Sequence, residues 1–138
     1  MKYSRQREMI REAVEQSDHH PTADKVFQKV RQKEPTISLA TVYRNLNQLV
    51  ENDLLKRIAV PGDSDHFDHT LQYHEHMICT NCGCVVDIWP DHSLKEQFQS
   101  LTDGTCTGYK LILYGLCKNC ERKAQNQNDM QRAKAQKG

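Results

Sequence analysis

Two pairs of cysteines with the spacing C-x-x-C set the strongest limit on what this chain can fold into. The first pair is Cys79 and Cys82, and the second pair, Cys117 and Cys120, follows 38 positions later. Each C-x-x-C turn can deliver two thiolates to one ion at about 2.3 Å, so the four sulfurs predict a tetrahedral structural Zn2+ site. The alternatives are four unrelated thiols or, in a secreted protein, two disulfide bonds. The long gap predicts a folded segment between the pairs.

The rest of the chain favours metal over disulfides. No apolar run approaches the roughly 18 residues of a membrane-spanning helix, and residues 1–7 lack the apolar centre of a secretion signal. We therefore expect a cytoplasmic protein without a membrane partner, whose thiols stay reduced. Residues 1–60 hold 11 Lys/Arg and 8 Asp/Glu, a net +3, whereas the whole chain carries only +1. This asymmetry favours a polyanion as the partner of the N-terminal half.

The histidines just before the first cysteine pair predict a second kind of metal site. Residues 74–79 read as a strand, so His74 and His76 share one face and Cys79 lies on the other. If the cysteine turn places Cys79 opposite Cys82, His74 falls opposite Asp87 and the carboxylate joins the imidazoles. Nitrogen and oxygen ligands on one face and sulfur on the other indicate two separate sites.

The N-terminal half predicts three helices and a hairpin. Apolar positions recur with helical spacing over residues 4–16, over a segment capped by Thr22, and from Ser38 to about Asn52. Short strands over 55–60 and 65–69 follow, turned by residues 61–63. This order of elements is that of a winged helix.

The solvent face of the third predicted helix is a candidate reader of DNA. Thr41, Arg44 and Gln48 lie opposite its apolar stripe, and Tyr43 lies at the border. In helix-turn-helix proteins the later helix enters the major groove, where such side chains can contact base edges. An ordinary solvated helix face is the alternative.

The C-terminal half predicts a small α/β domain, so the fold class is α+β. A helix over 92–101 should pack Leu94, Phe98 and Leu101, and an apolar strand over 110–116 should deliver the second cysteine pair. The expected domains are 1–70 (winged helix), 71–122 (metal binding and dimerisation) and 123–138 (a polar tail with little to bury). A domain of this size needs zinc and dimerisation to help it fold.

Several motifs in this order resemble the ferric uptake regulator family of metal-dependent repressors, over about residues 2–121. They are His20-Pro21-Thr22-Ala23-Asp24, Leu39-Ala40-Thr41-Val42-Tyr43-Arg44-Asn45-Leu46, Phe67-Asp68, His74-x-His76-x-x-Cys79-x-x-Cys82-Gly83 and Tyr114-Gly115-x-Cys117-x-x-Cys120. The resemblance implies a winged helix joined to a dimerisation domain, acting as a homodimer. It also implies that an N-terminal helix found in some members is missing here.

The resemblance also implies ligands and DNA contacts. Structural zinc would be held by Cys79, Cys82, Cys117 and Cys120, and the regulatory metal by His20, Asp68, His74, His76 and Asp87. That ion would join the two domains and fix the spacing of two recognition helices. The metal-loaded dimer would bind double-stranded DNA at an AT-rich inverted repeat, with Tyr43 and Arg44 at base-contacting positions.

The most specific expectation from the resemblance is the signal to which such a regulator would respond. Nitrogen and oxygen ligands without thiolate suit Fe2+ or Mn2+. Peroxide-sensing members carry Asp where Asp87 stands, and in them Fe2+ and peroxide oxidise a ligand histidine, here His20 or His74. Mn2+ would be the peroxide-insensitive co-repressor. The alternative within the family is an iron-responsive regulator of metal uptake, which Arg44 favours. Cys84 and Cys106 match no ligand position and are expected to be small buried side chains.

Two other classes compete with a repressor. A non-haem metalloenzyme would use His74, His76 and Asp87 as its centre, but it needs a general base. Glu75 is the nearby candidate, and strand alternation points it away from the imidazoles. A zinc-stapled interaction module would lack DNA binding, which the Arg44 face and the wing argue against. We expect no enzymatic activity.

Overall fold

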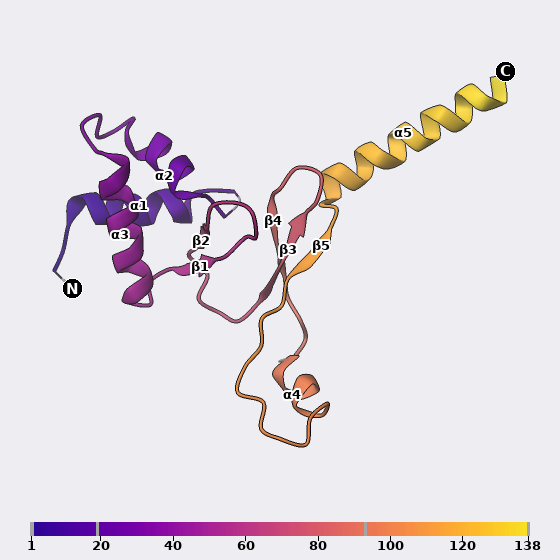
Figure 1. The fold of residues 1–138 in the computed structure, drawn as a ribbon. Helices are drawn as coiled ribbons and strands as arrows, with labels where there is room; N and C mark the ends of the chain where they lie inside the picture. Colours follow the sequence, from indigo (N-terminus) through magenta and orange to yellow (C-terminus); the bar gives the residue numbers. More distant parts are fainter. Residues whose placement is uncertain (1, 19, 93, 138) are drawn as a thin grey trace. The chain divides into compact units, whose positions relative to one another are not determined.

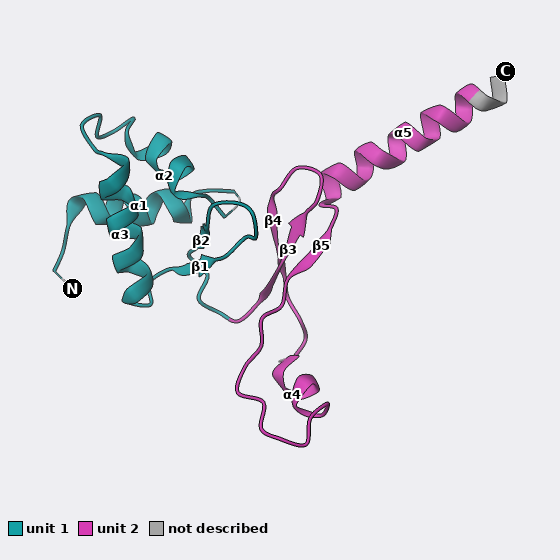
Figure 2. Ribbon diagram, viewed as in Figure 1, with its two compact units in different colours: residues 1–72 teal, residues 73–138 magenta. Residues whose placement is uncertain are grey.

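The computed structural model describes residues 2–18, 20–92 and 94–137, with side chains to residue 134. The chain divides into two compact units, 1–72 and 73–138 (Figure 2). The first contains three helices and a two-stranded sheet, and the second a three-stranded sheet with two helices. The α+β class expected from the sequence is therefore confirmed. The described helices are too short or too polar for a membrane span.

The three helices of the first unit begin where hydroxyl side chains can cap them (Figure 1). They are α1 (Arg5–Glu15), α2 (Ala23–Val30) and α3 (Leu39–Glu51). Ser4, Thr22 and Ser38 each accept a hydrogen bond from the backbone N–H three residues later. Each cap satisfies a donor that the helix leaves free and contributes about 1 kcal/mol.

One hydrophobic core joins these helices to the hairpin. Its buried residues are Ile10, Ala13, Val14, Ala23, Val26, Val30, Ile37, Val42, Leu46, Leu49, Leu55 and Phe67. The helical residues lie within the segments predicted from helical spacing, with Met9, Phe27 and Val50 partly buried against them, and Phe67 brings the second strand onto the same core. Asn45 is buried too, and its Nδ2 donates to the Thr41 carbonyl at 2.8 Å. The predicted winged helix is thus observed.

The wing is a short antiparallel pair, β1 (Lys56–Ile58) and β2 (His66–Asp68). Both strands are shorter than predicted. The Asp63 N–H donates to the Val60 carbonyl at 3.1 Å, and Gly62 has a φ of +76°, which glycine adopts without a steric penalty. The predicted turn at residues 61–63 is therefore present.

The second unit is built on a sheet in the order β4–β3–β5. β3 (Glu75–Cys79) pairs antiparallel with β4 (Val85–Ile88) and parallel with β5 (Leu113–Gly115). The assumed register of the hairpin was wrong, because His76, and not His74, lies opposite Asp87. A shift by two residues keeps every side chain on its face, so His76 and Asp87 still share one.

The turn explains this register. The Cys79 N–H donates to the Cys84 carbonyl, and the Gly83 N–H donates to the Cys79 carbonyl, both at 2.9 Å. Gly83 has a φ of +79°, which allows the chain to reverse there. The turn therefore closes at Cys84, two residues later than the sequence analysis assumed.

The two helices of this unit depart further from expectation. α4 (Leu94–Gln99) is shorter than the predicted 92–101, and Ser93 lies outside the described residues. The predicted packing was wrong for Leu101, which is 81% exposed, whereas Leu94 and Phe98 are half-buried and Phe98 packs on Tyr109. α5 (Lys118–Lys137) begins within the expected metal-binding domain and continues through the segment from residue 123 that was expected to be a polar tail. Its Lys, Gln, Ala and Arg residues favour helix even without burial.

The second unit has a sparse core. Among its described residues, only His74, Cys79, Val85 and Cys120 are buried. Large apolar side chains stay exposed, namely Trp89, Leu101, Ile112, Tyr114 and Leu116. A small domain with so little apolar burial needs another source of stability.

Candidate metal centres and nucleic-acid interface

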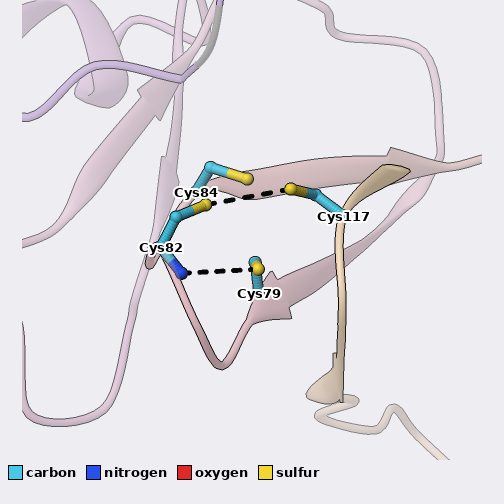
Figure 3. A group of neighbouring side chains, drawn as sticks. All are labelled: Cys79, Cys82, Cys84 and Cys117. Atoms are coloured by element: carbon cyan, nitrogen blue, oxygen red, sulfur yellow. Dashed lines mark hydrogen bonds between the residues drawn. The ribbon is translucent and has the colours of Figure 1, made fainter. Parts of the chain in front are cut away.

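A cluster of thiols lies at the end of the β3–β4 hairpin (Figure 3). The Sγ atoms of four cysteines all lie within 4.8 Å of one another, namely those of Cys79, Cys82, Cys84 and Cys117. The Sγ atoms of Cys82 and Cys117 are 3.8 Å apart. Zn–S bonds of about 2.3 Å in a tetrahedron place sulfurs about 3.8 Å apart, so this spacing fits a zinc ion.

Backbone N–H groups favour the thiolate form of two members. Hydrogen bonds from the N–H of Cys117 and of Cys82 lower the pKa of Cys79 to about 5. The Cys82 nitrogen lies 3.5 Å from that sulfur. The N–H of Cys120 in turn lowers the pKa of Cys117. Because metals bind the thiolate, the backbone here prepares the sulfurs for an ion.

The remaining predicted ligand, Cys120, lies in the first turn of α5. Its buried Sγ accepts a hydrogen bond from Asn81 Nδ2 at 3.3 Å. The Asn81 bond lowers the pKa of Cys120, but the interaction with Cys117 and burial outweigh it, and the pKa is about 11. Three of the four predicted zinc ligands therefore gather with Cys84, and Cys120 adjoins them through Cys117.

Cys84 was not predicted to belong to this group. It is half-buried, and burial, followed by its interactions with Cys82 and Cys117, raises its pKa to about 12. The sequence does contain the signal, since Cys84 follows Cys82 by two residues with a glycine between them. Cys106, also expected to be buried, is half-buried and donates to the Gly108 carbonyl.

A second cluster consists of two imidazoles around a carboxylate. It lies at the end of the β3–β4 pair away from the cysteine turn. His74 Nε2 lies 3.1 Å and His76 Nε2 3.4 Å from the same oxygen of Asp87, Oδ1. The His74 side chain is fully buried, and its ring stacks on Trp89 with centroids 4.5 Å apart. Two imidazole nitrogens converging on one carboxylate oxygen fit a divalent ion.

The first unit brings together the other two predicted ligands, His20 and Asp68. His20 Nδ1 lies 3.5 Å from Asp68 Oδ1, and the carboxylate is fully buried. That oxygen also accepts the Thr70 N–H at 2.9 Å. His20 reaches β2 because its carbonyl meets His66 Nδ1 at 2.6 Å and the Pro21 carbonyl accepts the Phe67 N–H at 2.9 Å.

The predicted DNA face of α3 is only partly free. Tyr43 and Arg44 are exposed, and Arg44 Nη2 donates to Thr41 Oγ1 at 3.4 Å. Thr41 and Gln48 are half-buried, and Gln48 Oε1 accepts from Arg7 Nη1 of α1 at 3.1 Å. Tyr43 and Arg44 are therefore the members of this set most available to a partner, and the contact with Arg7 was not predicted.

Comparison with known proteins places these features in one family. The model of the ferric uptake regulator family matches residues 1–114. The peroxide-responsive repressor PerR of Staphylococcus saprophyticus is 37% identical over 120 residues, which cover 86% of this chain and 81% of that protein.

Solved structures are similar over both units. The ferric uptake regulator of Vibrio cholerae is 29% identical, with a TM-score of 0.69, and the match covers 85% of this chain and 92% of that one. The peroxide stress regulator of Campylobacter jejuni is 27% identical, with a TM-score of 0.66, and the match covers 83% and 88%.

Proposed function

The chain belongs to the ferric uptake regulator family, and we propose that it is a metal-dependent, homodimeric repressor of transcription. The observation that carries this proposal is the convergence of His74 and His76 on Asp87, in a chain that also contains a winged helix. An N/O site of this kind can bind a labile ion, and a winged helix can bind DNA.

The proposed ions are two. Zn2+ would be held by Cys79, Cys82, Cys117 and Cys120 and would stabilise the poorly packed second unit. Fe2+ or Mn2+ would be held by His20, Asp68, His74, His76 and Asp87. Since two of these ligands belong to residues 1–72 and three to residues 73–138, the ion would restrict how the two units move.

That restriction is the proposed route from metal to DNA. A homodimer carries two α3 helices, and an inverted repeat presents two half-sites at a fixed separation. The dimer would bind an AT-rich inverted repeat when the ion holds each α3 at the matching distance. Arg44, assisted by Thr41, Tyr43 and Gln48, would contact bases. The exposed Trp89, Tyr114 and Leu116 of the second unit support dimerisation.

We propose peroxide as the signal, a function for which the relative in Staphylococcus saprophyticus is named. Fe2+ held by these ligands would supply the electrons that reduce hydrogen peroxide, and an imidazole of His20 or His74 would be the group that gains an oxygen at a ring carbon. Both side chains are largely shielded from solvent, at 11% and 0% exposure. An oxidised imidazole is a poorer ligand, so the ion would leave and the DNA would be released.

An enzymatic role has less support. Glu75, the general base that a metalloenzyme would need, instead accepts hydrogen bonds from Tyr73 and Tyr109 at 2.7 and 2.5 Å. Its carboxylate is therefore already engaged by two hydroxyl groups.

The test uses zinc-containing protein loaded without oxygen with Fe2+ or Mn2+. DNA binding to promoter fragments is measured before and after hydrogen peroxide, and peptides are analysed by mass spectrometry. We expect both forms to bind DNA, and only the Fe2+ form to lose binding and gain one oxygen on His20 or His74. If neither metal promotes DNA binding, the proposal is refuted. Release by a chelator, with no peroxide response, would identify an iron-responsive regulator.

A further inference from the structure

The chain offers five thiols around a site that needs four. Cys79, Cys82, Cys84 and Cys117 form the cluster of Figure 3, and Cys120 is buried beside it. A structural zinc ion is tetrahedral and accepts four ligands. One thiol is therefore in excess, and the question is which one the ion leaves out.

The hairpin register fixes Cys84 at the site. Ile78 pairs with Val85, so the next facing positions toward the turn are Cys79 and Cys84. The Cys79 N–H donates to the Cys84 carbonyl at 2.9 Å, which holds the two backbones together. Facing residues of an antiparallel pair have their Cβ atoms about 5 Å apart on the same side, within reach of one ion.

Cys120 is less firmly committed to that position. It is held by α5 rather than by the hairpin, and its Sγ already accepts a hydrogen bond from Asn81 Nδ2. Cys82 and Cys117, by contrast, place their sulfurs 3.8 Å apart, the edge of a zinc tetrahedron. Cys79, Cys82 and Cys117 thus define three positions, and Cys84 and Cys120 can compete for the fourth.

We propose that Cys84 is a zinc-binding residue that shares the fourth coordination position with Cys120. This inference rests on the proposed zinc site and adds a ligand to it. In the exchange, the entering Cys84 thiol releases its proton as it binds zinc, and the departing Cys120 thiolate takes one up. No oxidation occurs, and the charge of the site is unchanged.

Zinc content and thiol protection of the full-length protein test the proposal. The variants are Cys84→Ser, Cys120→Ser, the double variant, and Cys79→Ser, with Cys106→Ser as the control outside the cluster. Each single change at 84 or 120 should keep one zinc per chain with little loss of affinity, because the thiol that remains fills the fourth position. The double variant and Cys79→Ser should lose the zinc, and Cys106→Ser should match the wild type.

The wild type provides a measurement that does not depend on a variant folding. Pulses of N-ethylmaleimide, read by mass spectrometry, should label Cys106 quickly in zinc-loaded protein and should label Cys84 and Cys120 slowly. Removal of zinc should speed the labelling of Cys84 more than that of Cys106. Equal labelling of Cys84 with and without zinc, or a Cys120→Ser protein as free of zinc as Cys79→Ser, overturns the inference. A wild type without zinc overturns the zinc assignment itself.

Discussion

His76 lies opposite Asp87 across the β3–β4 pair, with its Nε2 3.4 Å from Asp87 Oδ1. His74, just before β3, approaches the same oxygen to 3.1 Å. One carboxylate oxygen is thus shared by two imidazoles that lie two residues apart on a strand. Since alternate residues share a face, the strand itself sets this geometry, and Asp87 is its centre.

The first prediction follows from that central position. Asp87→Asn keeps the shape of the side chain but removes its charge, so the affinity for Mn2+ should fall by at least about tenfold to a hundredfold, the cost of losing even an outer-shell partner. Mn2+-dependent DNA binding should fall with it, and zinc content should not change. Titration calorimetry with Mn2+ measures the effect.

Asp91→Asn is the matched control, because Asp91 is an exposed carboxylate shortly after β4. It should bind Mn2+ like the wild type. Equal Mn2+ affinity of the two variants would show that Asp87 is not a ligand.

Local features were the part of the fold that the sequence predicted well. Thr22 and Ser38 were recognised as caps because capping depends on one side chain and the next three residues. The imidazole and carboxylate faces were recognised because strand alternation survives a two-residue shift in register.

The errors concern information that is not local. Turn geometry sets the register of a hairpin, and nothing in the spacing of Cys79 and Cys82 showed that the turn closes at Cys84. The packing of Leu101 failed because apolar periodicity predicts a stripe without saying what covers it. The segment of α5 has no apolar stripe, so only the helical propensity of its residues could have indicated a helix, and that signal was not used.

The second prediction concerns acid release of zinc. The ordinary thiol pKa is about 8.5, and N–H groups from Cys117 and Cys82 lower that of Cys79 to about 5. A lowered pKa keeps the thiolate, and so its contribution to zinc binding, present at neutral pH, and this contribution is lost as the pH falls through about 5. Bound zinc extends the pH range in which the thiolate persists to still lower pH.

We therefore expect the protein to keep zinc at neutral pH and to release it only near or below pH 5, as followed with a colorimetric zinc indicator. Cys106→Ser should show the same profile, since Cys106 lies outside the thiol cluster. Release that begins well above pH 5 would contradict the role of these N–H groups.

The third prediction concerns Arg44, the exposed cation on the reading face of α3. Arg44→Ala should weaken specific DNA binding by about 1–3 kcal/mol, the value of one bidentate contact to a base. Binding to unrelated DNA should change little. Fluorescence anisotropy with operator and scrambled duplexes distinguishes the two.

Arg122→Ala, which removes an exposed arginine from α5, is the control for loss of charge. If it weakens specific binding as much as Arg44→Ala does, Arg44 acts through charge alone and does not read bases.

The fourth prediction concerns a hydrogen-bonded group outside both metal sites. Glu75 Oε1 accepts from the Tyr109 hydroxyl at 2.5 Å and from the Tyr73 hydroxyl at 2.7 Å, and the two hydroxyls also contact each other. Tyr109 further packs on Phe98 of α4. The Tyr109 pKa is raised by burial and by Glu75, so its hydroxyl remains a donor.

Tyr109→Phe removes that donor and should lower the free energy of unfolding by about 1.5–3 kcal/mol, the range for a bond to a charged group. Denaturant unfolding of the zinc-loaded protein measures it. Tyr114→Phe is the control, because Tyr114 is 59% exposed. Equal stability of the two variants would mean that the Glu75 group does not hold α4 to the sheet.

The last prediction concerns how Asp87 tunes the response to peroxide. The five proposed ligands would leave one position open on an ion that prefers six, and the short side chain of Asp87 would leave that position free. Asp87→Glu adds one methylene and can bring a second oxygen onto the ion, which closes it. The variant should therefore still bind DNA with Fe2+ but should keep binding at peroxide levels that release the wild type. The added oxygen on His20 or His74 should fall in parallel, while Mn2+ forms of both proteins stay on DNA. An Asp87→Glu protein oxidised at the wild-type rate would refute this role for Asp87, and oxidation of Cys79 or Cys84 with intact histidines would assign the response to the thiols.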